Sequence, residues 1–179
     1  MGALLPTSRR AVDDMLDLAE LDRAELVVEL GAGTGTHTRA VLERLGPRAR
    51  LISFEIDPSL AAAVRDKLPD PRLRVVTGSA EDLQQVLEGQ RPQVVVSALP
   101  FTSLPAGAGR TILERTAQAL APGGVLLVLQ YSPAIASELS RLFDSVRRRV
   151  CLLNAPPAFL YACWGPRTAG DGAFPGSTT

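Results

Sequence analysis

Segment 28–35, Val-Glu-Leu-Gly-Ala-Gly-Thr-Gly, places an acidic side chain just before three closely spaced glycines. The apolar run at 26–30 predicts a buried strand that ends at the first of them. Glycines let the chain turn sharply out of a strand and let a ligand lie against bare backbone. Ligands of open α/β sheets bind at the carboxyl ends of strands. We therefore expect a ligand site bordered by Glu29, Gly31, Ala32, Gly33, Gly35 and Thr36, although the glycines alone can also mean only a tight turn.

The spacing of these glycines separates two cofactors. A dinucleotide site needs the pattern G-x-G-x-x-G, so that a helix start can hold a pyrophosphate. Here Gly35 comes one residue early, and Thr36 stands at the position of the third glycine. Glu29 would repel a pyrophosphate but suits a cation. S-adenosylmethionine carries an ammonium group and a sulfonium centre and no phosphate, so the acidic residue favours this methyl donor.

Two later segments carry polar residues at predicted strand ends. Phe-Glu-Ile-Asp at 54–57 places Glu55 about 20 residues beyond the glycines, where a carboxylate can accept both ribose hydroxyls of a nucleoside. Ile56 is positioned to pack on the adenine face. The segment 78–82 follows the third strand, and we expect its Ser79, Ala80 and Glu81 to border the adenine edge. For Glu55 alone, a solvated carboxylate is the simple alternative.

Apolar runs alternate with helical patterns along the chain. Strands are predicted at 26–30, 51–54, 73–76, 94–97 and 125–129, with a helix near 111–120 and another around 134–143. Runs at 146–153 and 158–164 are separated by only four residues, which is too short for a parallel crossover and predicts an antiparallel hairpin. The apolar positions Val12, Met15, Leu16 and Ala19 predict a leading amphipathic helix.

The predicted fold is α/β: a Rossmann-like, seven-stranded, mainly parallel sheet with helices on both faces and a C-terminal antiparallel hairpin. We expect one domain over residues 1–164. Residues 165–179 are rich in Gly, Pro, Ser and Thr, which predicts a flexible tail.

Three of these motifs together resemble the cofactor motifs of class I S-adenosylmethionine-dependent methyltransferases: 29–35, Glu55 and 78–82. The resemblance extends from about residue 2 to residue 164. It implies that Glu29 and the glycines lie along the methionine part of S-adenosylmethionine, that Glu55 holds the ribose, and that the fourth strand ends near the transferable methyl. Many relatives carry an Asp at position 79 that bonds the adenine amine; here Ser79 is present, and Glu81 can substitute.

The segment 97–105, Ser-Ala-Leu-Pro-Phe-Thr-Ser-Leu-Pro, follows the fourth strand and is the predicted acceptor site. Ser97 would border the donor. Methyl transfer from a sulfonium is an in-line displacement, so catalysis can consist mostly of positioning. An apolar pocket would disfavour the charged form of an acceptor amine, and the segment can supply one from Leu99, Pro100, Phe101 and Leu104. Tyr131 offers a hydroxyl or a ring face for a methylated ammonium. The alternative is that both rings fill the core.

This segment resembles two groups of methyltransferases. Bacterial phospholipid N-methyltransferases resemble the chain most continuously: at 2–9, at 97–100 with Pro105, at Gln130-Tyr131 and at 154–158. Adenine-amine methyltransferases, including the rRNA adenine dimethyltransferases, match more distantly at Pro100 and Phe101. They carry an Asn where this chain has Ala98, which cannot accept a bond from an amine. The resemblance implies a phospholipid head-group amine as acceptor; an RNA or DNA adenine, a small amine, or a non-catalytic S-adenosylmethionine-binding module are the alternatives.

Charge and composition give no global attraction to nucleic acid or membrane, since 19 basic residues balance 19 acidic ones. Two local features can meet a lipid surface: the apolar segment 1–6 followed by Arg9-Arg10, and the cluster Arg147, Arg148 and Arg149. The alternative for the cluster is that edge-strand arginines point to solvent.

The two cysteines, Cys151 and Cys163, lack metal-ligand spacing, so no metal site is expected. No segment approaches the roughly 20 apolar residues of a membrane span. These features predict a reduced, cytoplasmic protein, peripheral at most at the inner membrane surface, with an oligomeric state that the sequence leaves open. His37, the single histidine, is expected beside the cofactor or on a helix surface rather than in catalysis.

Overall fold

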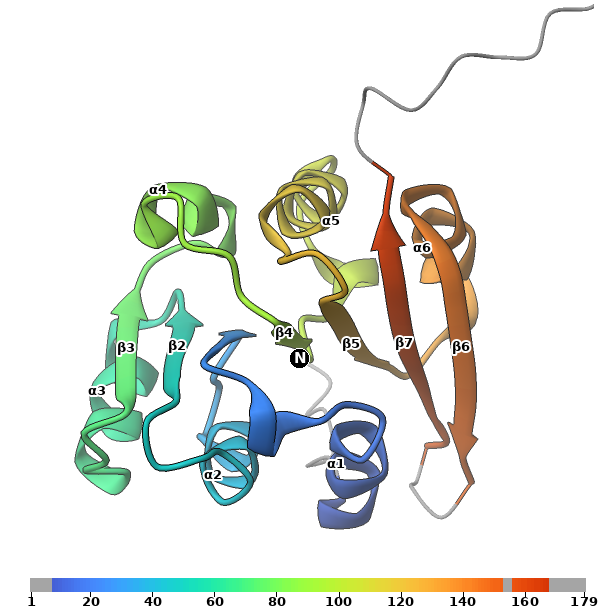
Figure 1. Cartoon of the computed structure of the whole chain (residues 1–179). Helices are drawn as coiled ribbons and strands as arrows, with labels where there is room; N and C mark the ends of the chain where they lie inside the picture. The colour runs from blue at the N-terminus through green and yellow to red at the C-terminus, as the bar shows by residue number, and fades with distance from the viewer. Residues whose placement is uncertain (1–7, 153–155, 168–179) are drawn as a thin grey trace, which may run out of the picture.

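A computed structural model describes residues 8–152 and 156–167 of the 179-residue chain. A twisted sheet in the order β3-β2-β1-β4-β5-β7-β6 forms its centre (Figure 1). The strand bounds are Leu26–Leu30 for β1, Arg50–Glu55 for β2, Leu73–Thr77 for β3, Val94–Ser97 for β4, Val125–Gln130 for β5, Phe143–Cys151 for β6 and Ala158–Pro166 for β7.

The pairing of these strands confirms the predicted fold class. Strands β1 to β5 pair in parallel, while β7 runs antiparallel to both β5 and β6. All residues of β1, β4 and β5 are buried, as expected for parallel strands covered on both faces. The carboxyl ends of β1, β2, β4 and β5 lie along one edge of the sheet.

The hairpin strands are longer than predicted. Strand β6 begins at Phe143, which pairs with Pro166, so the expected helix around 134–143 is instead a 3₁₀ turn at Pro133–Ile135 followed by α6 at Ala136–Leu142. Strand β7 continues to Pro166, two residues into the predicted tail, because β6 supplies pairing partners this far. Strand β6 ends at Cys151, so Leu152 of the predicted strand 146–153 lies in a turn instead. Residue 153 and the tail from residue 168 lie outside the described residues.

Helices cover the sheet on both faces, as Figure 1 shows. Helices α1 (Arg9–Leu16), α2 (Thr36–Leu42) and α3 (Pro58–Lys67) lie on one side; α4 (Leu83–Leu87), α5 (Ala108–Ala119) and α6 lie on the other. Two apolar clusters fill the spaces between the layers, one beneath α1 and α2 and one beneath α4, α5 and α6. The second cluster also receives the partly buried Leu99 and Phe101 of the acceptor segment.

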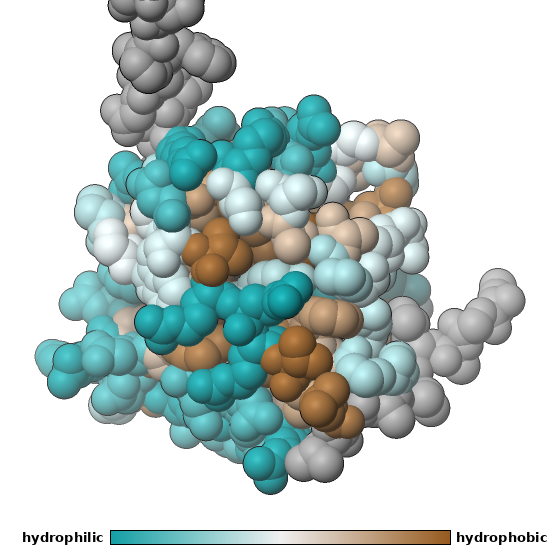
Figure 2. All heavy atoms as spheres, turned by 90° about the vertical axis from the view of Figure 1, so that its right-hand side faces the viewer, coloured by the Kyte–Doolittle hydropathy of each residue, from teal (hydrophilic) through white to brown (hydrophobic). Residues whose placement is uncertain are grey.

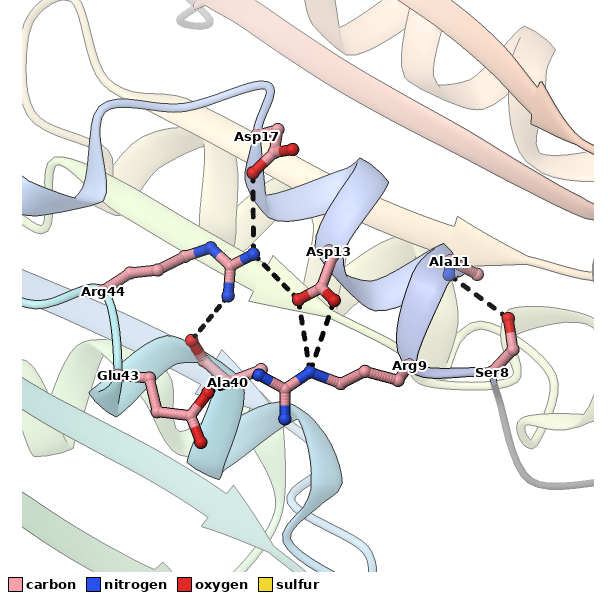
Figure 3. Close-up of polar contacts among 8 residues, drawn as sticks. All are labelled: Ser8, Arg9, Ala11, Asp13, Asp17, Ala40, Glu43 and Arg44. Atoms are coloured by element: carbon pink, nitrogen blue, oxygen red, sulfur yellow. Dashed lines mark hydrogen bonds and ion pairs between the residues drawn. The ribbon is translucent and has the colours of Figure 1, made fainter.

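Helix α1 is held by ion pairs to the residues that directly follow α2 (Figure 3). The Ser8 hydroxyl accepts a hydrogen bond from Ala11 N at 3.2 Å and caps the helix. Asp13 pairs with Arg44 at 2.8 Å and with Arg9 at 3.3 Å, and Arg9 also pairs with Glu43. Burial opposes ionisation of Asp13, but the two guanidinium groups outweigh it and lower its pKa.

This helix is the predicted leading element, although it ends at Leu16 and leaves Ala19 beyond it. Val12, Met15 and Leu16 are fully buried, as expected for its apolar face. Arg9 and Arg10, predicted as a membrane contact, lie within ion-pair distance of acidic residues. The apolar segment 1–6, with which that prediction began, lies outside the described residues.

Candidate functional site

The turn between β1 and α2 brings three glycines to the carboxyl edge of the sheet. Gly31, Gly33 and Gly35 have positive φ angles of 86°, 53° and 85°, a region that favours glycine. The amides of Gly31 and Ala32 both donate to the Phe54 carbonyl at 2.9 Å, which ties the turn to the end of β2. The turn therefore has a conformation fixed by its neighbours.

The glycines differ in what surrounds them. A Cβ added to Gly31 would lie 2.7 Å from Leu99 Cδ2, and one added to Gly35 would lie 3.4 Å from Val64 Cγ2 of α3. A Cβ added to Gly33 would meet nothing within 4 Å. The absence of a side chain thus lets neighbouring side chains pack against Gly31 and Gly35. Gly33 instead borders open space in which a ligand can approach the backbone.

Glu55, the last residue of β2, lies beside Gly33. Its Oε2 accepts a hydrogen bond from Gly33 N at 2.7 Å, and its Oε1 accepts one from Asp57 N at 2.9 Å. The carboxylate is buried and oriented by backbone amides, and each oxygen retains a further lone pair for a ligand hydroxyl. Ile56 next to it is 72% exposed, which leaves its side chain free to cover a flat ring.

Glu29 lies beneath the turn rather than beside the open space. Its Oε2 accepts hydrogen bonds from Thr38 Oγ1 at 2.7 Å and Ser53 Oγ at 2.5 Å. Its Oε1 is buried without a hydrogen-bond partner in the described part of the chain. Burial raises the Glu29 pKa to about 7 against the opposing effect of the two hydroxyl bonds. A nearby cation would favour the ionised form of this carboxyl group.

His37, in the first turn of α2, is buried, and burial lowers its pKa to about 4. The imidazole is therefore neutral near pH 7, which agrees with a residue that supports the turn. Thr36 begins the same helix, and its hydroxyl lies 3.2 Å from that of Thr34.

The third segment reaches the same edge from β3. The Gly78 amide donates to the Glu55 carbonyl at 2.9 Å, so this segment begins against the end of β2. Ser79 caps the 3₁₀ turn Ala80–Asp82 by accepting a hydrogen bond from Glu81 N at 3.1 Å. Arg115 of α5 donates to the Glu81 carbonyl, which holds the turn against the helix layer.

The acceptor segment is fixed mainly through the backbone of Leu99. The Leu99 carbonyl accepts hydrogen bonds from Phe101 N at 2.9 Å and from Gln130 Nε2 at 2.6 Å. The buried Ser97 hydroxyl accepts a long bond of 3.4 Å from Leu99 N. The Leu99 side chain approaches Gly31, so the acceptor segment meets the glycine turn at this residue.

Gln130 entered the sequence analysis only as part of a family resemblance, and no role in the candidate site was predicted for it. Its Nε2 also donates to the Leu129 carbonyl at 2.7 Å, and the residue is buried at the end of β5. A polar residue that ends the wholly apolar run 125–129 was the available signal.

The two predicted catalytic rings pack on opposite faces of the sheet. Phe101 contacts the cluster beneath α5, where a Cβ added to Gly109 would lie 3.3 Å from Phe101 Cδ1. Tyr131 packs against the cluster beneath α1 and α2. Both rings are only partly buried, so each combines core packing with exposed surface, while Pro100 is exposed. The structure thus brings Gly33, Glu55 and Leu99 to one edge and leaves the rings on either side of it.

Comparison with known proteins agrees with this architecture. A family model described as a methyltransferase domain matches residues 27–124. An ornithine lipid N-methyltransferase of Singulisphaera acidiphila is 35% identical over 149 residues, which cover 80% of this chain and 78% of the relative. A probable ribosomal RNA small subunit methyltransferase A of Methanococcoides burtonii is 31% identical over 96 residues; the match covers 52% of this chain but 32% of that protein.

Among solved structures, N-methyltransferase NodS of Bradyrhizobium japonicum in complex with S-adenosyl-L-homocysteine superimposes with a TM-score of 0.75. The superposition covers 89% of this chain and 87% of NodS. At 16% sequence identity, it shows that the two folds are similar. The family match covers the glycine turn, Glu55 and the acceptor segment. The chain therefore belongs to the methyltransferase domain family and uses S-adenosylmethionine as its methyl donor.

Proposed function

We propose that this methyltransferase methylates the amine of a lipid head group, of the phosphatidylethanolamine type. The observation that carries the proposal is the 35% identity with an ornithine lipid N-methyltransferase over four-fifths of the chain. Ornithine and ethanolamine head groups share an aliphatic amine, and this shared chemistry is what the acceptor site must recognise.

The residues at the edge fit S-adenosylmethionine. Open space beside Gly33 accommodates a ligand against the backbone, and the oriented carboxylate of Glu55 suits the ribose hydroxyls. Ile56 would cover the adenine, with Ser79, Ala80 and Glu81 along its edge and Ser97 on the acceptor side. The unsatisfied Glu29 Oε1 lies beneath the turn, where the cationic methionine part would favour the ionised form of this carboxyl group and be attracted by it. Bound there, S-adenosylmethionine supplies an electrophilic methyl group.

The acceptor side suits an uncharged alkyl amine. Leu99, Pro100 and Phe101 present apolar surface, and neither 97–107 nor 130–137 contains an Asp or Glu. Apolar groups without a neighbouring carboxylate disfavour the ammonium form, so the amine reaches its nucleophilic state more readily. Tyr131 provides a ring face for the methylated ammonium product. Catalysis is then a matter of holding the amine in line with the methyl group.

A lipid acceptor implies work at a membrane surface, and we propose a cytoplasmic enzyme that contacts the inner membrane peripherally. None of the helices within 8–152 and 156–167 is long and apolar enough to cross a bilayer.

A ribosomal RNA adenine is the second candidate acceptor. It is favoured by the match with a probable rRNA methyltransferase over about half of the chain and by the Pro100-Phe101 pair. Ala98 weighs against it, since the position lacks an oxygen to hold the exocyclic amine.

Transfer of a radiolabelled methyl group tests the proposal. The purified protein is incubated with labelled S-adenosylmethionine and, in parallel, with phosphatidylethanolamine vesicles, ornithine lipid vesicles or bulk RNA. We expect label in an aminolipid and none in RNA. Label in RNA alone, or none in any acceptor, would contradict the proposal.

A further inference from the structure

Strand β6 forms one free edge of the sheet and carries three consecutive arginines. Arg147, Arg148 and Arg149 are exposed, and none forms an ion pair with a carboxylate of the described residues. Arg147 lies over the Trp164 ring at 5.5 Å, which orients its side chain without neutralising the charge. Since the chain as a whole has no net charge, this edge is a local concentration of positive charge.

Exposed aliphatic side chains continue the same strand. Val150 is 39% exposed and Leu152, one residue beyond β6, is 77% exposed. They are among the few large hydrophobic residues exposed in the described part of the chain. Figure 2 views the molecule from this side and shows hydrophilic residues next to hydrophobic residues on the surface. We call residues 147–150 and 152 the β6 patch.

The register places the β6 patch beside the acceptor site. Val150 pairs with Phe159, and Phe159 pairs with Gln130, whose amide holds the Leu99 carbonyl. With about 4.8 Å between neighbouring strands, Val150 lies roughly 10 Å from the end of β5. Because β6 and β5 both run antiparallel to β7, the exposed end of β6 points to the sheet edge that carries the glycine turn.

We propose that the β6 patch is the surface through which the enzyme contacts an anionic lipid bilayer. Arginines beside aliphatic side chains match the interfacial layer of such a bilayer, where phosphates lie next to acyl chains. The contact brings the acceptor edge against the surface that holds the head groups. This inference rests on the proposed function and adds the face by which the enzyme docks.

Other occupants fit the β6 patch less well. Edge-to-edge pairing with a second copy would bring arginines of both copies together, and like charges on adjoining strands are destabilising. Single-stranded RNA is usually held by exposed aromatic rings on which bases stack. Here the residues beyond the arginines are aliphatic, and the Trp164 ring is covered by Arg147.

Vesicle co-sedimentation of the full chain tests the inference. Phosphatidylcholine vesicles with and without phosphatidylglycerol are compared for wild type and for R147Q/R148Q/R149Q. Each arginine near an anionic surface contributes about fivefold to binding, so the triple variant should bind about 100-fold more weakly. The loss should be confined to anionic vesicles and should shrink at high salt.

A matched control removes the same charge at the opposite end of the sheet. Arg23, Arg48 and Arg50 line the amino-terminal edge, and R23Q/R48Q/R50Q should bind vesicles like wild type. V150S/L152S should weaken binding without changing the salt dependence. Melting temperature and affinity for S-adenosylhomocysteine, measured for every variant, exclude misfolding as the cause.

Equal losses in both arginine triples, or no loss in R147Q/R148Q/R149Q, would overturn the inference. So would binding of the wild type to RNA through these arginines without binding to vesicles. The binding assay is independent of methyl transfer. A protein that binds anionic vesicles through the β6 patch but methylates no aminolipid would support the docking surface and contradict the proposed function.

Discussion

At the ends of β1 and β2, two carboxylates are held by hydroxyl groups and backbone amides: Glu29 by Thr38 and Ser53, and Glu55 by Gly33 and Asp57. At the ends of β4 and β5, the hydrogen bonds instead converge on the Leu99 backbone, and the adjoining segments contain no carboxylate. In the proposed site, the donor half thus contains carboxylates, and the acceptor half contains apolar side chains fixed by backbone hydrogen bonds. This difference predicts that substitutions in the two halves will affect separate steps.

The largest effect is expected for Gly33→Val in the donor half. The valine side chain would occupy the open space beside the turn, and the positive φ angle of 53° adds backbone strain. We expect at least a 100-fold loss of affinity for S-adenosylhomocysteine, measured by calorimetry. Gly123→Val is the matched control, because Gly123 also has a positive φ and an open surrounding but precedes β5 at the opposite edge. Equal affinity in both variants would place the donor elsewhere.

Glu55→Ala should weaken donor binding by about 1.5–3 kcal/mol, the range for a hydrogen bond to a charged group. Part of this loss comes from the Gly33 amide, which loses its acceptor. Glu55→Gln separates the contribution of the charge from that of the hydrogen bonds, since the glutamine side chain keeps one acceptor oxygen but carries no charge. A calorimetric change near zero in the alanine variant would remove Glu55 from the ribose site.

Gln130→Leu tests the acceptor half. The substitution removes both bonds of Gln130 Nε2 and loosens the Leu99 backbone, at a cost of about 1–3 kcal/mol. We expect methyl transfer at saturating donor to fall about 5- to 100-fold while donor affinity stays within about twofold. Gln118→Leu, at an exposed glutamine of α5, is the control. A parallel loss of donor affinity would show that the two halves are not separable.

The last expected effect is on stability rather than on binding or catalysis, and it acts through Glu29. Because its pKa is raised from 4.5 to about 7, the folded protein binds more protons than the unfolded chain between these values. Its contribution to stability is complete below about pH 4.5 and is lost as the pH rises through 7. In Glu29→Gln, this fall in the free energy of unfolding, about 3 kcal/mol for a pKa raised from 4.5 to about 7, should disappear from urea unfolding curves. Glu25→Gln, at an exposed carboxylate just before β1, should retain this pH dependence. If the free energy of unfolding of Glu29→Gln still falls with pH as in the wild type, Glu29 is not the source of the fall.

The two halves of the site also differ in how far the sequence could predict them. Strand positions and the hairpin follow from local apolar runs and short connections, and the glycine turn with Glu55 follows from spacing within 27 residues. The bonds from Gln130 to Leu99 depend on how β4 and β5 align, which local patterns do not reveal. The enclosure of Glu29 likewise depends on Thr38 and Ser53, which come from two different elements. Pairing between β6 and β7 beyond Trp164 also arises only in the folded sheet.

The structure of the complex with S-adenosylhomocysteine would test the central claim most directly. We predict the ribose hydroxyls within hydrogen-bond distance of Glu55, the homocysteine chain against Gly33, and the sulfur directed toward Leu99. A ligand bound away from the ends of β1 and β2, or a Glu55 carboxylate without contact to it, would contradict this account of the site.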